Sequence, residues 1–320
     1  LLKAVIATSL TMQALLAVMF LPRFLTMGID PAHAVWDAVF MAISVFNNAG
    51  FVILPGGLEP HVTDWWMLVP IILGTTVGAI GFPVIMDVAK NLRAPRRWRL
   101  HTKLTLSTYL ILAFIGALAL ALTEWHNPAT LGSVDTPSKI LNAMLAGVNS
   151  RSSGLSALNV GAMHSQTHFV QDILMMIGGG SASTAGGVKV TTFAVLVLAV
   201  IAEARGDRDI ETFGRRIPTS TVRLAVAVSL LGLAMVAISV VLLLTMTDHS
   251  LDIILFETVS AFATVGLSTG VTPNLPVAAK YVLIALMFAG RTGSMTVAAA
   301  LALRERSRVI RMPEEQPIIG

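Results

Sequence analysis

Cysteine is absent from this chain of 320 residues, and charged residues make up only 12% of it. The lack of cysteine excludes disulfides, thiolate metal sites and cysteine nucleophiles. Ordinary soluble domains carry about 25% charged residues, so this chain has too few charges to cover a wetted surface. Apolar residues account for 55% of the chain, and its mean hydropathy is +0.77. A soluble globule and a disordered chain are therefore excluded.

The apolar residues are concentrated in six runs of about 20 residues, the length that an α-helix needs to cross a bilayer. These runs do not alternate between apolar and polar residues, as the strands of a membrane barrel do. Helices satisfy their own backbone hydrogen bonds in lipid, so we expect an all-α integral membrane protein. The six expected spans are residues 4–21, 65–89, 104–123, 169–202, 224–246 and 277–303.

Lysine and arginine are concentrated in every second connection and after the last run. The positive-inside rule makes these segments cytoplasmic, so we expect a multi-pass protein of the cell inner (plasma) membrane with a cytoplasmic C-terminus. Contact of the basic segments with lipid headgroups or RNA is the alternative to a topology anchor; we expect the lipid bilayer and no nucleic acid as a partner. The basic residues are Lys90, Arg93, Arg96, Arg97, Arg99 and Lys103; Arg205, Arg208, Arg215, Arg216 and Arg223; and Arg304, Arg306, Arg308 and Arg311.

Each remaining connection contains a further apolar stretch that is too short to cross a bilayer. The three stretches, residues 37–46, 139–148 and 251–262, each end in a polar segment built around one glycine. We call these segments the Gly50 knot (47–51), the Gly154 knot (151–155) and the Gly266 knot (263–267); their glycines are 104 and 112 residues apart. A repeated order of helix, short helix, knot and helix indicates internal duplication.

The physics of such a unit favours a cation. A short helix that ends inside the membrane leaves carbonyl groups unsatisfied at its negative C-terminal end. Glycine allows the next residues to turn their carbonyls toward an axis, where a ring of oxygens replaces the hydration shell of an ion. Three ordinary external loops with glycine turns are the alternative. The expected filter residues are Asn48, Ala49 and Gly50; Ser152, Ser153 and Gly154; and Thr264, Val265 and Gly266.

Glycine and hydroxyl residues interrupt the fourth run at residues 178–187 (GGGSASTAGG). Such a break within a membrane is tolerated only beside protein or water. The phosphate-binding pattern G-x-x-x-x-G-K-[ST] is not met, because Val188 separates Gly187 from Lys189. A packing kink against neighbouring helices is the other structural alternative.

Two arginines lie in apolar surroundings. Arg291 is inside the sixth run and lies roughly 20 Å from Arg304 along a helix, so its charge does not reach the cytoplasmic surface. An arginine at this depth is costly and indicates a function. Arg151 belongs to the Gly154 knot, and an arginine in the path would repel a cation. We therefore expect Arg151 to lie behind the knot and donate to backbone carbonyls, with Glu257 as a candidate partner.

Enzyme chemistry finds little support. His164 and His168 have helical spacing, but the glutamate of the H-E-x-x-H metalloprotease pattern is missing. We expect these histidines to be solvated or interfacial. Asp87 and Asp172 lie near the ends of apolar runs and do not form a central pair for a proton relay. We expect no catalytic residue; an intramembrane enzyme and a non-conducting membrane scaffold subunit remain the alternatives of a different class.

The knots resemble known filter sequences. Residues 46–51 (FNNAGF), 150–155 (SRSSGL) and 263–270 (ATVGLSTG) resemble the second, third and fourth filters of the Trk/Ktr/HKT superfamily of potassium transporters, closest to the KtrB-type subunit. The third is usually T-R-T-A-G-F, so serine here replaces threonine and leucine replaces phenylalanine. Residues 80–85 (IGFPVI) also resemble the second inner helix of that family.

The resemblance implies four helix–pore helix–helix repeats around one central pore, of which three are visible here. These are repeat 2 at residues 1–98, repeat 3 at 99–210 with an intramembrane gating loop, and repeat 4 with a cytoplasmic tail at 211–320. The first repeat is absent, and we expect this chain to be a fragment of a longer protein. A trimeric ring of a different geometry is the alternative.

The resemblance further implies potassium transport across the membrane by a pore-forming subunit, within a homodimer that binds a cytosolic ring of nucleotide-binding regulatory subunits. One glycine per repeat suggests weak selectivity, which leaves a less selective Na⁺/K⁺ channel or transporter and Na⁺ as a coupling ion open. The implied gate consists of Gly178, Gly179, Gly180, Ser181, Ser183, Thr184, Gly186, Gly187, Lys189 and Arg291.

Overall fold

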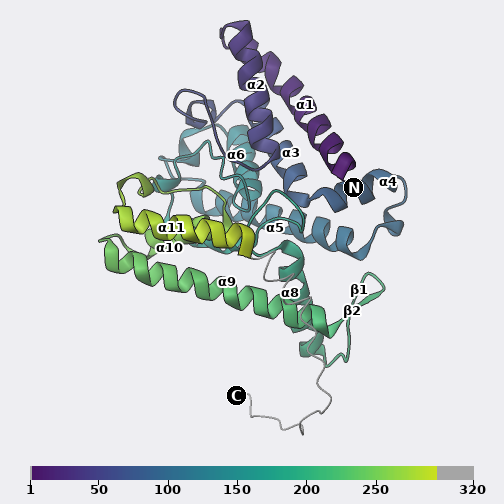
Figure 1. Cartoon of the computed structure of the whole chain (residues 1–320). Coiled ribbons are helices and arrows are strands. Elements are labelled where there is room, and N and C mark those ends of the chain that lie inside the picture. Colours follow the sequence, from purple (N-terminus) through teal and green to yellow (C-terminus); the bar gives the residue numbers. More distant parts are fainter. Residues whose placement is uncertain (1, 294–320) are drawn as a thin grey trace.

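The computed structural model describes residues 2–293, whose regular secondary structure is helical apart from one β-hairpin (Figure 1). The predicted all-α class is therefore confirmed. The hairpin, which was not predicted, pairs β1 (Ile210–Thr212) with β2 (Arg215–Ile217). The helices are α1 (Leu2–Thr26), α2 (Pro31–Phe46), α3 (Trp65–Ile80), α4 (Phe82–Lys90), α5 (Leu100–Glu124), α6 (Thr136–Asn149), α7 (Ser165–Met176), α8 (Val190–Arg205), α9 (Thr219–Met246), α10 (Leu251–Ala263) and α11 (Val277–Phe288).

Three helices, α1, α5 and α9, are long and apolar enough to cross a membrane by themselves. Helix α5 shows how such a helix faces lipid, because Leu110, Phe114, Leu118 and Leu122 form an exposed apolar stripe at intervals of four residues. Its opposite side is buried against α6 and α7. The predicted spans 4–21, 104–123 and 224–246 therefore correspond to single helices, each somewhat longer than its apolar run.

The predicted span 65–89 is two helices and not one. Helices α3 and α4 meet at Gly81 with a bend of 96°. Gly81 has a φ of +92°, and Pro83 lies in the first turn of α4. A left-handed glycine followed by proline ends one helix and starts another, and an average of hydropathy over the run does not detect this.

The predicted spans 169–202 and 277–303 are also not continuous helices in the described residues. Helices α7 and α8 are separated by residues 177–189, which contain the glycine-rich segment. Helix α11 passes into a single π-helical turn at Ala289–Gly293. Residues 294–303 of the last predicted span, and the basic tail with Arg304, lie outside the described residues.

The three short apolar stretches are the helices α2, α6 and α10. Helix α2 begins six residues before the predicted stretch 37–46, because Asp30 caps it by accepting a hydrogen bond from the Ala32 amide and Pro31 opens the first turn. All three helices end at a knot, as predicted, in Asn47, Ser150 and Thr264.

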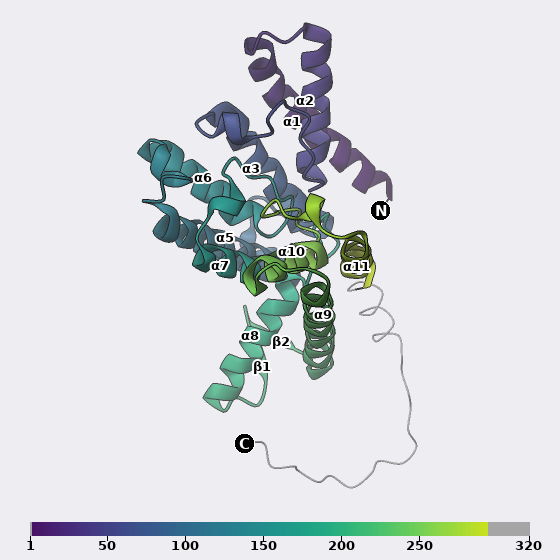
Figure 2. The same ribbon diagram turned by 90° about the vertical axis from the view of Figure 1, so that its left-hand side faces the viewer.

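Among residues 2–293, the two largest of four hydrophobic clusters hold most of the helices together. One joins α1, α2, α3 and α6, and the other joins α5, α7, α9, α10 and α11. Helix α6 belongs to both, with Leu141 in the first core and Ala143 in the second. Figures 1 and 2 show the α1–α2 pair projecting from the rest, while α9, α10 and α11 pack against one another. The Gly154 knot at the end of α6 is mostly buried, whereas Ala49 and Phe51 of the Gly50 knot are exposed.

Candidate ion pathway and gate

The three knots meet at one place in the molecule. A Cβ atom added to Gly50 would lie 2.1 Å from the carbonyl oxygen of Ser153, and one added to Gly154 would lie 2.5 Å from the carbonyl oxygen of Val265. Gly50, Gly154 and Gly266 also have left-handed φ angles of +77°, +60° and +99°. Glycine is thus required at these positions for two reasons: the backbone conformation and the close approach of a neighbouring backbone. Backbone segments that lie 104 and 112 residues apart in the chain are in contact.

Each knot is fixed to its own short helix by the same kind of bond. A polar side chain in the last turn of the helix donates to the carbonyl of the residue that follows the knot glycine. The carbonyl of the residue after the glycine is therefore held toward the helix. The carbonyls of the preceding knot residues are not used in this bond. Sequence reasoning missed these residues, although a serine or asparagine five or six positions before each glycine was the available signal. The bonds join Ser44 to Phe51 (2.7 Å), Asn149 to Leu155 (2.6 Å) and Ser260 to Leu267 (2.6 Å).

The backbone of the knots contains left-handed residues other than glycine. Asn48 and Thr264, each two positions before a knot glycine, have φ angles of +53° and +50°. In the Gly154 knot the left-handed residue is Ser153, one position later, with φ +80°. Such conformations cost of order 1–3 kcal/mol each and persist where the surroundings impose them. The predicted filter residues of repeat 3 thus differ in conformation from those of the other two knots.

Arg151 lies behind the Gly154 knot, as expected. Its side chain is completely buried, and its guanidinium donates to the carbonyl of Tyr109 at 2.6 Å and stacks 3.7 Å from the centre of the Tyr109 ring. A second, longer bond of 3.4 Å reaches the carbonyl of Gly147 on α6. The charge is therefore directed away from the meeting point of the knots and ties the Gly154 knot to α5.

The expected pairing of Arg151 with Glu257 is wrong. Glu257 accepts hydrogen bonds from the hydroxyl of Ser268 at 2.8 Å and from the backbone amide of Thr269 at 2.7 Å, and the hydroxyls of Thr269 and Thr272 also donate to it. The carboxylate is thus saturated by the segment that leaves the Gly266 knot. Glu257 thus holds this segment against α10. The bonds form only when residues 268–272 fold back over the helix.

The glycine-rich segment is a loop whose two ends lie together. Ile177 and Val188 form a parallel bridge, and the amide of Gly178 donates to the carbonyl of Val188 at 2.8 Å. Farther along, the amide of Gly180 donates to the carbonyl of Ala79 at 2.7 Å, so the loop crosses to the end of α3. The break predicted at residues 178–187 is thus an ordered loop between two helices and not a kink within one helix.

The loop packs directly against two knots. The hydroxyl of Thr184 accepts from the Asn48 side chain at 2.6 Å and donates to the carbonyl of Gly78 at 3.0 Å. A Cβ atom added to Gly186 would lie 2.1 Å from the hydroxyl oxygen of Thr264. The loop therefore contacts the Gly50 knot through Thr184 and the Gly266 knot through Gly186.

Two cationic side chains belong to the same region. Arg291, in the π-helical turn after α11, donates to the hydroxyl of Thr264 at 3.5 Å. Lys189 donates to the carbonyl of Ala185 within its own loop at 2.7 Å, and its charge interacts with that of Arg291. Ser181 lies apart from the knots and is 3.1 Å from the hydroxyl of Thr191 on α8. The structure thus gathers most, but not all, of the predicted gate residues beside the knots.

A glycine near the break of the following helix contacts the end of the short helix in two of the three repeats. A Cβ atom on Gly78 would lie 2.0 Å from the carbonyl oxygen of Phe46, and one on Gly290 would lie 1.7 Å from that of Phe262. Phe46 and Phe262 both lie four residues before a knot glycine. Gly178, the first residue of the loop, lies 24 residues after Gly154. Gly290 lies the same number of residues after Gly266. Sequence reasoning did not identify Gly78 or Gly290.

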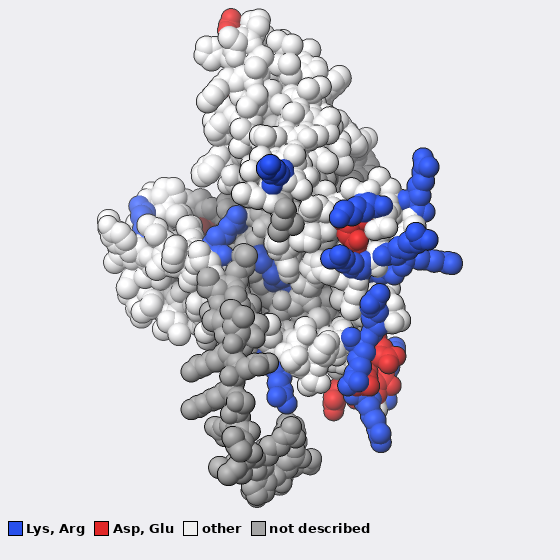
Figure 3. Space-filling view, turned by 45° about the vertical axis from the view of Figure 1, so that its right-hand side comes forward, with Lys and Arg blue, Asp and Glu red and all other residues white. Residues whose placement is uncertain are grey.

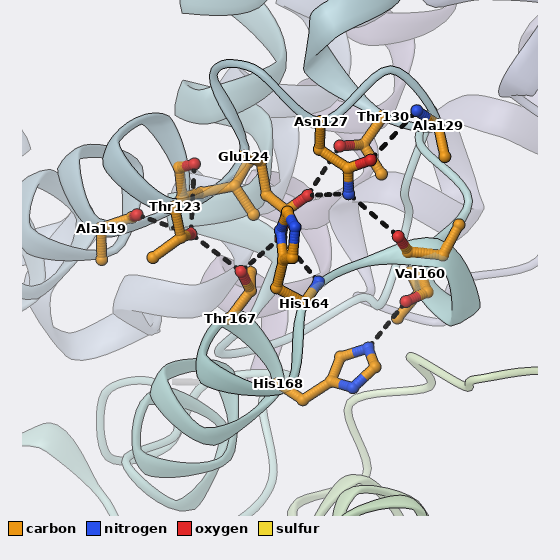
Figure 4. A network of polar contacts seen from close by, with 12 residues as sticks. Ala119, Thr123, Glu124, Asn127, Ala129, Thr130, Val160, His164, Thr167 and His168 are labelled. Atoms are coloured by element: carbon orange, nitrogen blue, oxygen red, sulfur yellow. Dashed lines mark hydrogen bonds and ion pairs between the residues drawn. The ribbon is translucent and has the colours of Figure 1, made fainter.

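A buried carboxylate organises a network of polar contacts between α5 and α7 (Figure 4). Glu124, at the end of α5, is fully buried and accepts hydrogen bonds from the side chains of Asn127 (2.6 Å), Thr130 (2.7 Å) and Thr167, and from the backbone amide of His164 (2.9 Å). It therefore joins the end of α5, the connection that follows it and the start of α7.

One of the two histidines of this region corrects the sequence-based expectation. His164 is exposed, as expected, and its Nδ1 also lies 3.1 Å from the carboxylate of Glu124. His168 is buried, with its Nε2 2.7 Å from the carbonyl of Val160. Both rings serve this structural network, whose residues lie close together only after folding. Among residues 2–293 there is no group of three or more His, Asp or Glu side chains able to hold a metal ion.

Comparison with known proteins identifies relatives over most of the chain. Residues 1–310 match the family described as TrkH, cation transport protein. The Ktr system potassium uptake protein B of Bacillus subtilis (strain 168) is 39% identical over 290 residues, which are 90% of this chain and 64% of that protein. The protein of the same name from Vibrio alginolyticus is 34% identical over 289 residues, covering 88% of this chain and 62% of that protein.

Two further comparisons extend this result. The potassium/sodium uptake protein NtpJ of Enterococcus hirae is 32% identical over 312 residues, 95% of this chain and 67% of that protein. The structure of the potassium transporter TrkH from Vibrio parahaemolyticus superposes with a TM-score of 0.71 at 18% identity and covers 94% of this chain and 64% of that chain. This likeness shows the fold. The chain spans less than two thirds of the length of the two potassium uptake proteins B.

Proposed function

Because the chain belongs to the TrkH family of cation transport proteins, we propose that it forms the conducting path of a potassium uptake system. Its membership agrees with the predicted Trk/Ktr/HKT superfamily and with the prediction that it is not an enzyme. The proposal refers to the whole protein, of which this chain supplies repeats 2, 3 and 4 at residues 1–98, 99–210 and 211–320.

The observation that carries the proposal is the meeting of the three knots. Gly50, Gly154 and Gly266 approach without side chains between them, and the short helices α2, α6 and α10 end at this place. Helix C-termini carry partial negative charge, which favours a cation. Carbonyl oxygens of the predicted filter residues would replace the hydration shell of K⁺ here, with the cation as the transported substrate and not a resident cofactor.

The proposed gate is the loop 178–187 together with Lys189 and Arg291. Its support is the contact of Thr184 with Asn48 and of Gly186 with Thr264, which puts the loop against the inner side of two knots. Two positive side chains beside this loop repel a cation at short range. In the proposed closed state the loop covers the path, and it opens when these contacts are released.

A second candidate is a less selective Na⁺/K⁺ pathway, with Na⁺ either permeating or coupled to K⁺ uptake. The relative NtpJ is named a potassium/sodium uptake protein. Each knot of this chain also contains a single glycine, which gives a short filter with few binding sites.

The proposed partners follow from the surface and from the relatives. Lysine and arginine gather over the α4–α5 connection and the β-hairpin, on one side of the molecule (Figure 3). This side is the cytoplasmic one in our proposal, where a ring of nucleotide-binding regulatory subunits would bind to a homodimer. The first relatives are named as parts of a Ktr system, a name that implies further components.

Rescue of a bacterium that lacks its own potassium uptake tests the proposal. Expression of the whole protein that contains this chain is expected to restore growth at low external K⁺ and uptake of labelled Rb⁺. A non-conducting scaffold subunit would reach the membrane at the same level without restoring either. That result would reject conduction while leaving membership of the family intact.

A further inference from the structure

A buried carboxylate on α7 has no hydrogen-bonding partner among the described residues. Asp172 is only 6% exposed, and its Oδ1 accepts no hydrogen bond. No lysine, arginine or histidine of residues 2–293 forms an ion pair with it. Glu124 and Glu257, the other buried carboxylates described above, are each bound by several donors. Asp172 is the exception and takes no part in the proposed filter or gate.

Asp172 forms part of the wall of a cavity of about 410 Å³ that is otherwise lined almost entirely by apolar residues. Its walls come from α7, α8, α9 and α10, together with the residues at the two ends of the loop. Ser229 on α9 is its second polar lining residue, and the Ser229 hydroxyl is also buried without a hydrogen bond. The apolar lining residues include Ile173, Met176, Phe193, Leu233, Val236 and Val259.

We propose that this cavity is a binding site for an amphiphilic amine, with the ammonium group on the Asp172 carboxylate and the hydrocarbon body against α9 and α10. An ammonium N–H would donate to Asp172 Oδ1, and the Ser229 hydroxyl offers a second acceptor. A buried carboxylate is costly unless it is paired, and a pair surrounded by hydrocarbon is screened little by water. The volume lies in the range of ligand pockets, about 300–1,000 Å³.

Other occupants fit this lining less well. A neutral acyl chain would satisfy the apolar walls but leave Asp172 without a partner. A metal ion needs several oxygen ligands, whereas the lining offers the side chains of Asp172 and Ser229 alone. An amine satisfies both parts of the site at once, because it combines one positive donor with an apolar body.

The cavity touches the two ends of the loop 178–187. Ile177 and Val188, which form the bridge between these ends, are both lining residues. A bound amine would therefore press on the base of the loop. An effect of the amine on ion flux rests on the proposed gating function, whereas binding to the cavity does not.

Photolabelling of the whole protein in phosphatidylcholine nanodiscs tests the site. The probe is a dodecylamine with a diazirine in its chain, and the matched dodecanol probe lacks the charge. Labelled residues are located by mass spectrometry. We expect the amine to label the lining of α9 and α10, and Asp172→Asn to reduce this labelling by at least about tenfold. Asp252→Asn is the control, because Asp252 interacts electrostatically with Asp172 but does not line the cavity.

The possible outcomes separate clearly. Loss of labelling in Asp172→Asn with retention in Asp252→Asn supports the site. Equal labelling by amine and alcohol, or an equal decrease in both variants, overturns it, because general hydrophobicity or surface charge would then be sufficient. If Asp172→Asn does not fold, Leu233→Trp decides, since it adds bulk at a lining position and keeps the carboxylate. If Leu233→Trp does not reduce the labelling, the proposal is also overturned.

Discussion

At the scale of single residues, the glycines of the knots are constrained in two independent ways. Gly50 combines a φ of +77° with a carbonyl oxygen 2.1 Å from the place of a Cβ atom. Gly57, only seven residues away, has a similar φ of +70° but open space around it. A comparison of the two positions therefore separates the effect of backbone conformation from the effect of close approach.

Gly50→Ser is expected to raise the permeation of Na⁺ relative to K⁺ and to reduce total K⁺ uptake severalfold. The added atoms push the Gly50 knot away from Ser153, which widens the spacing of the carbonyls that select the ion. Uptake of K⁺ and Na⁺ by cells that lack other K⁺ transporters measures both effects. Gly57→Ser, with the same left-handed strain but no contact, is expected to leave the ratio unchanged. An unchanged ratio in Gly50→Ser contradicts the filter assignment.

Glu257→Gln is expected to lower stability by about 1–3 kcal/mol, because one of its oxygens becomes an NH₂ group that faces hydroxyl and amide donors. The thermal unfolding midpoint in detergent is the measurement. Glu59→Gln provides the control, since Glu59 is exposed. Equal midpoints for the two variants would show that the bonds of Glu257 do not hold the segment after the Gly266 knot.

At the scale of structural elements, the repeated feature is a helix that stops where it meets a knot. Helix α3 ends one residue before Gly81, α7 gives way to the loop, and α11 continues into a π-helical turn. In the first and last cases the contact is made by Gly78 and Gly290 against the carbonyls of Phe46 and Phe262. A helix broken at this depth leaves polar backbone that only protein or water can satisfy, and in α3 the loop 178–187 supplies part of it.

Thr184→Val is expected to open the proposed gate more often. It removes the bonds of the Thr184 hydroxyl to Asn48 and to the carbonyl of Gly78 while keeping the shape of the side chain. Each hydrogen bond contributes about 0.5–1.5 kcal/mol, so the loss of two bonds should raise the ratio of open to closed protein by at least about fivefold. Uptake of labelled Rb⁺ by proteoliposomes without regulatory subunits gives the open fraction.

The control for this variant is Thr191→Val. Thr191 contacts Ser181 at the other side of the loop and makes no contact with a knot. Its replacement should leave uptake unchanged. If Thr184→Val instead reduced uptake, the loop would support the open path and the assignment of residues 178–187 as a closing element would be wrong.

At the scale of the whole molecule, the basic side shown in Figure 3 predicts an orientation in the membrane. We expect Arg97→Cys to react with a membrane-impermeant maleimide only from the cytoplasmic side, and Glu59→Cys only from the outside. Both positions are exposed, and the chain contains no natural cysteine that would react in the background. Labelling of intact cells and of inverted vesicles distinguishes the two sides. Reaction of both positions from the same side would refute the topology.

Repetition explains which parts of this molecule could be predicted. The short helices and their knots occur three times, so hydropathy and one glycine in each were sufficient to locate α2, α6 and α10. The bend at Gly81 was missed because a mean over an apolar run does not register a single left-handed residue. The partners of Glu257 and His168 were missed because they come from segments whose paths depend on tertiary folding.

The contacts at Gly78 and Gly290 limit which substitutions these positions tolerate. At both positions main chain meets main chain, and even a methyl group would separate the two helices. Every substitution at these two positions therefore introduces a steric clash, and no side chain is small enough to be accommodated gradually. Side chains of graded size are available instead at neighbouring positions, such as Ser44, Asn149 and Ser260, which bind the backbone of the knots.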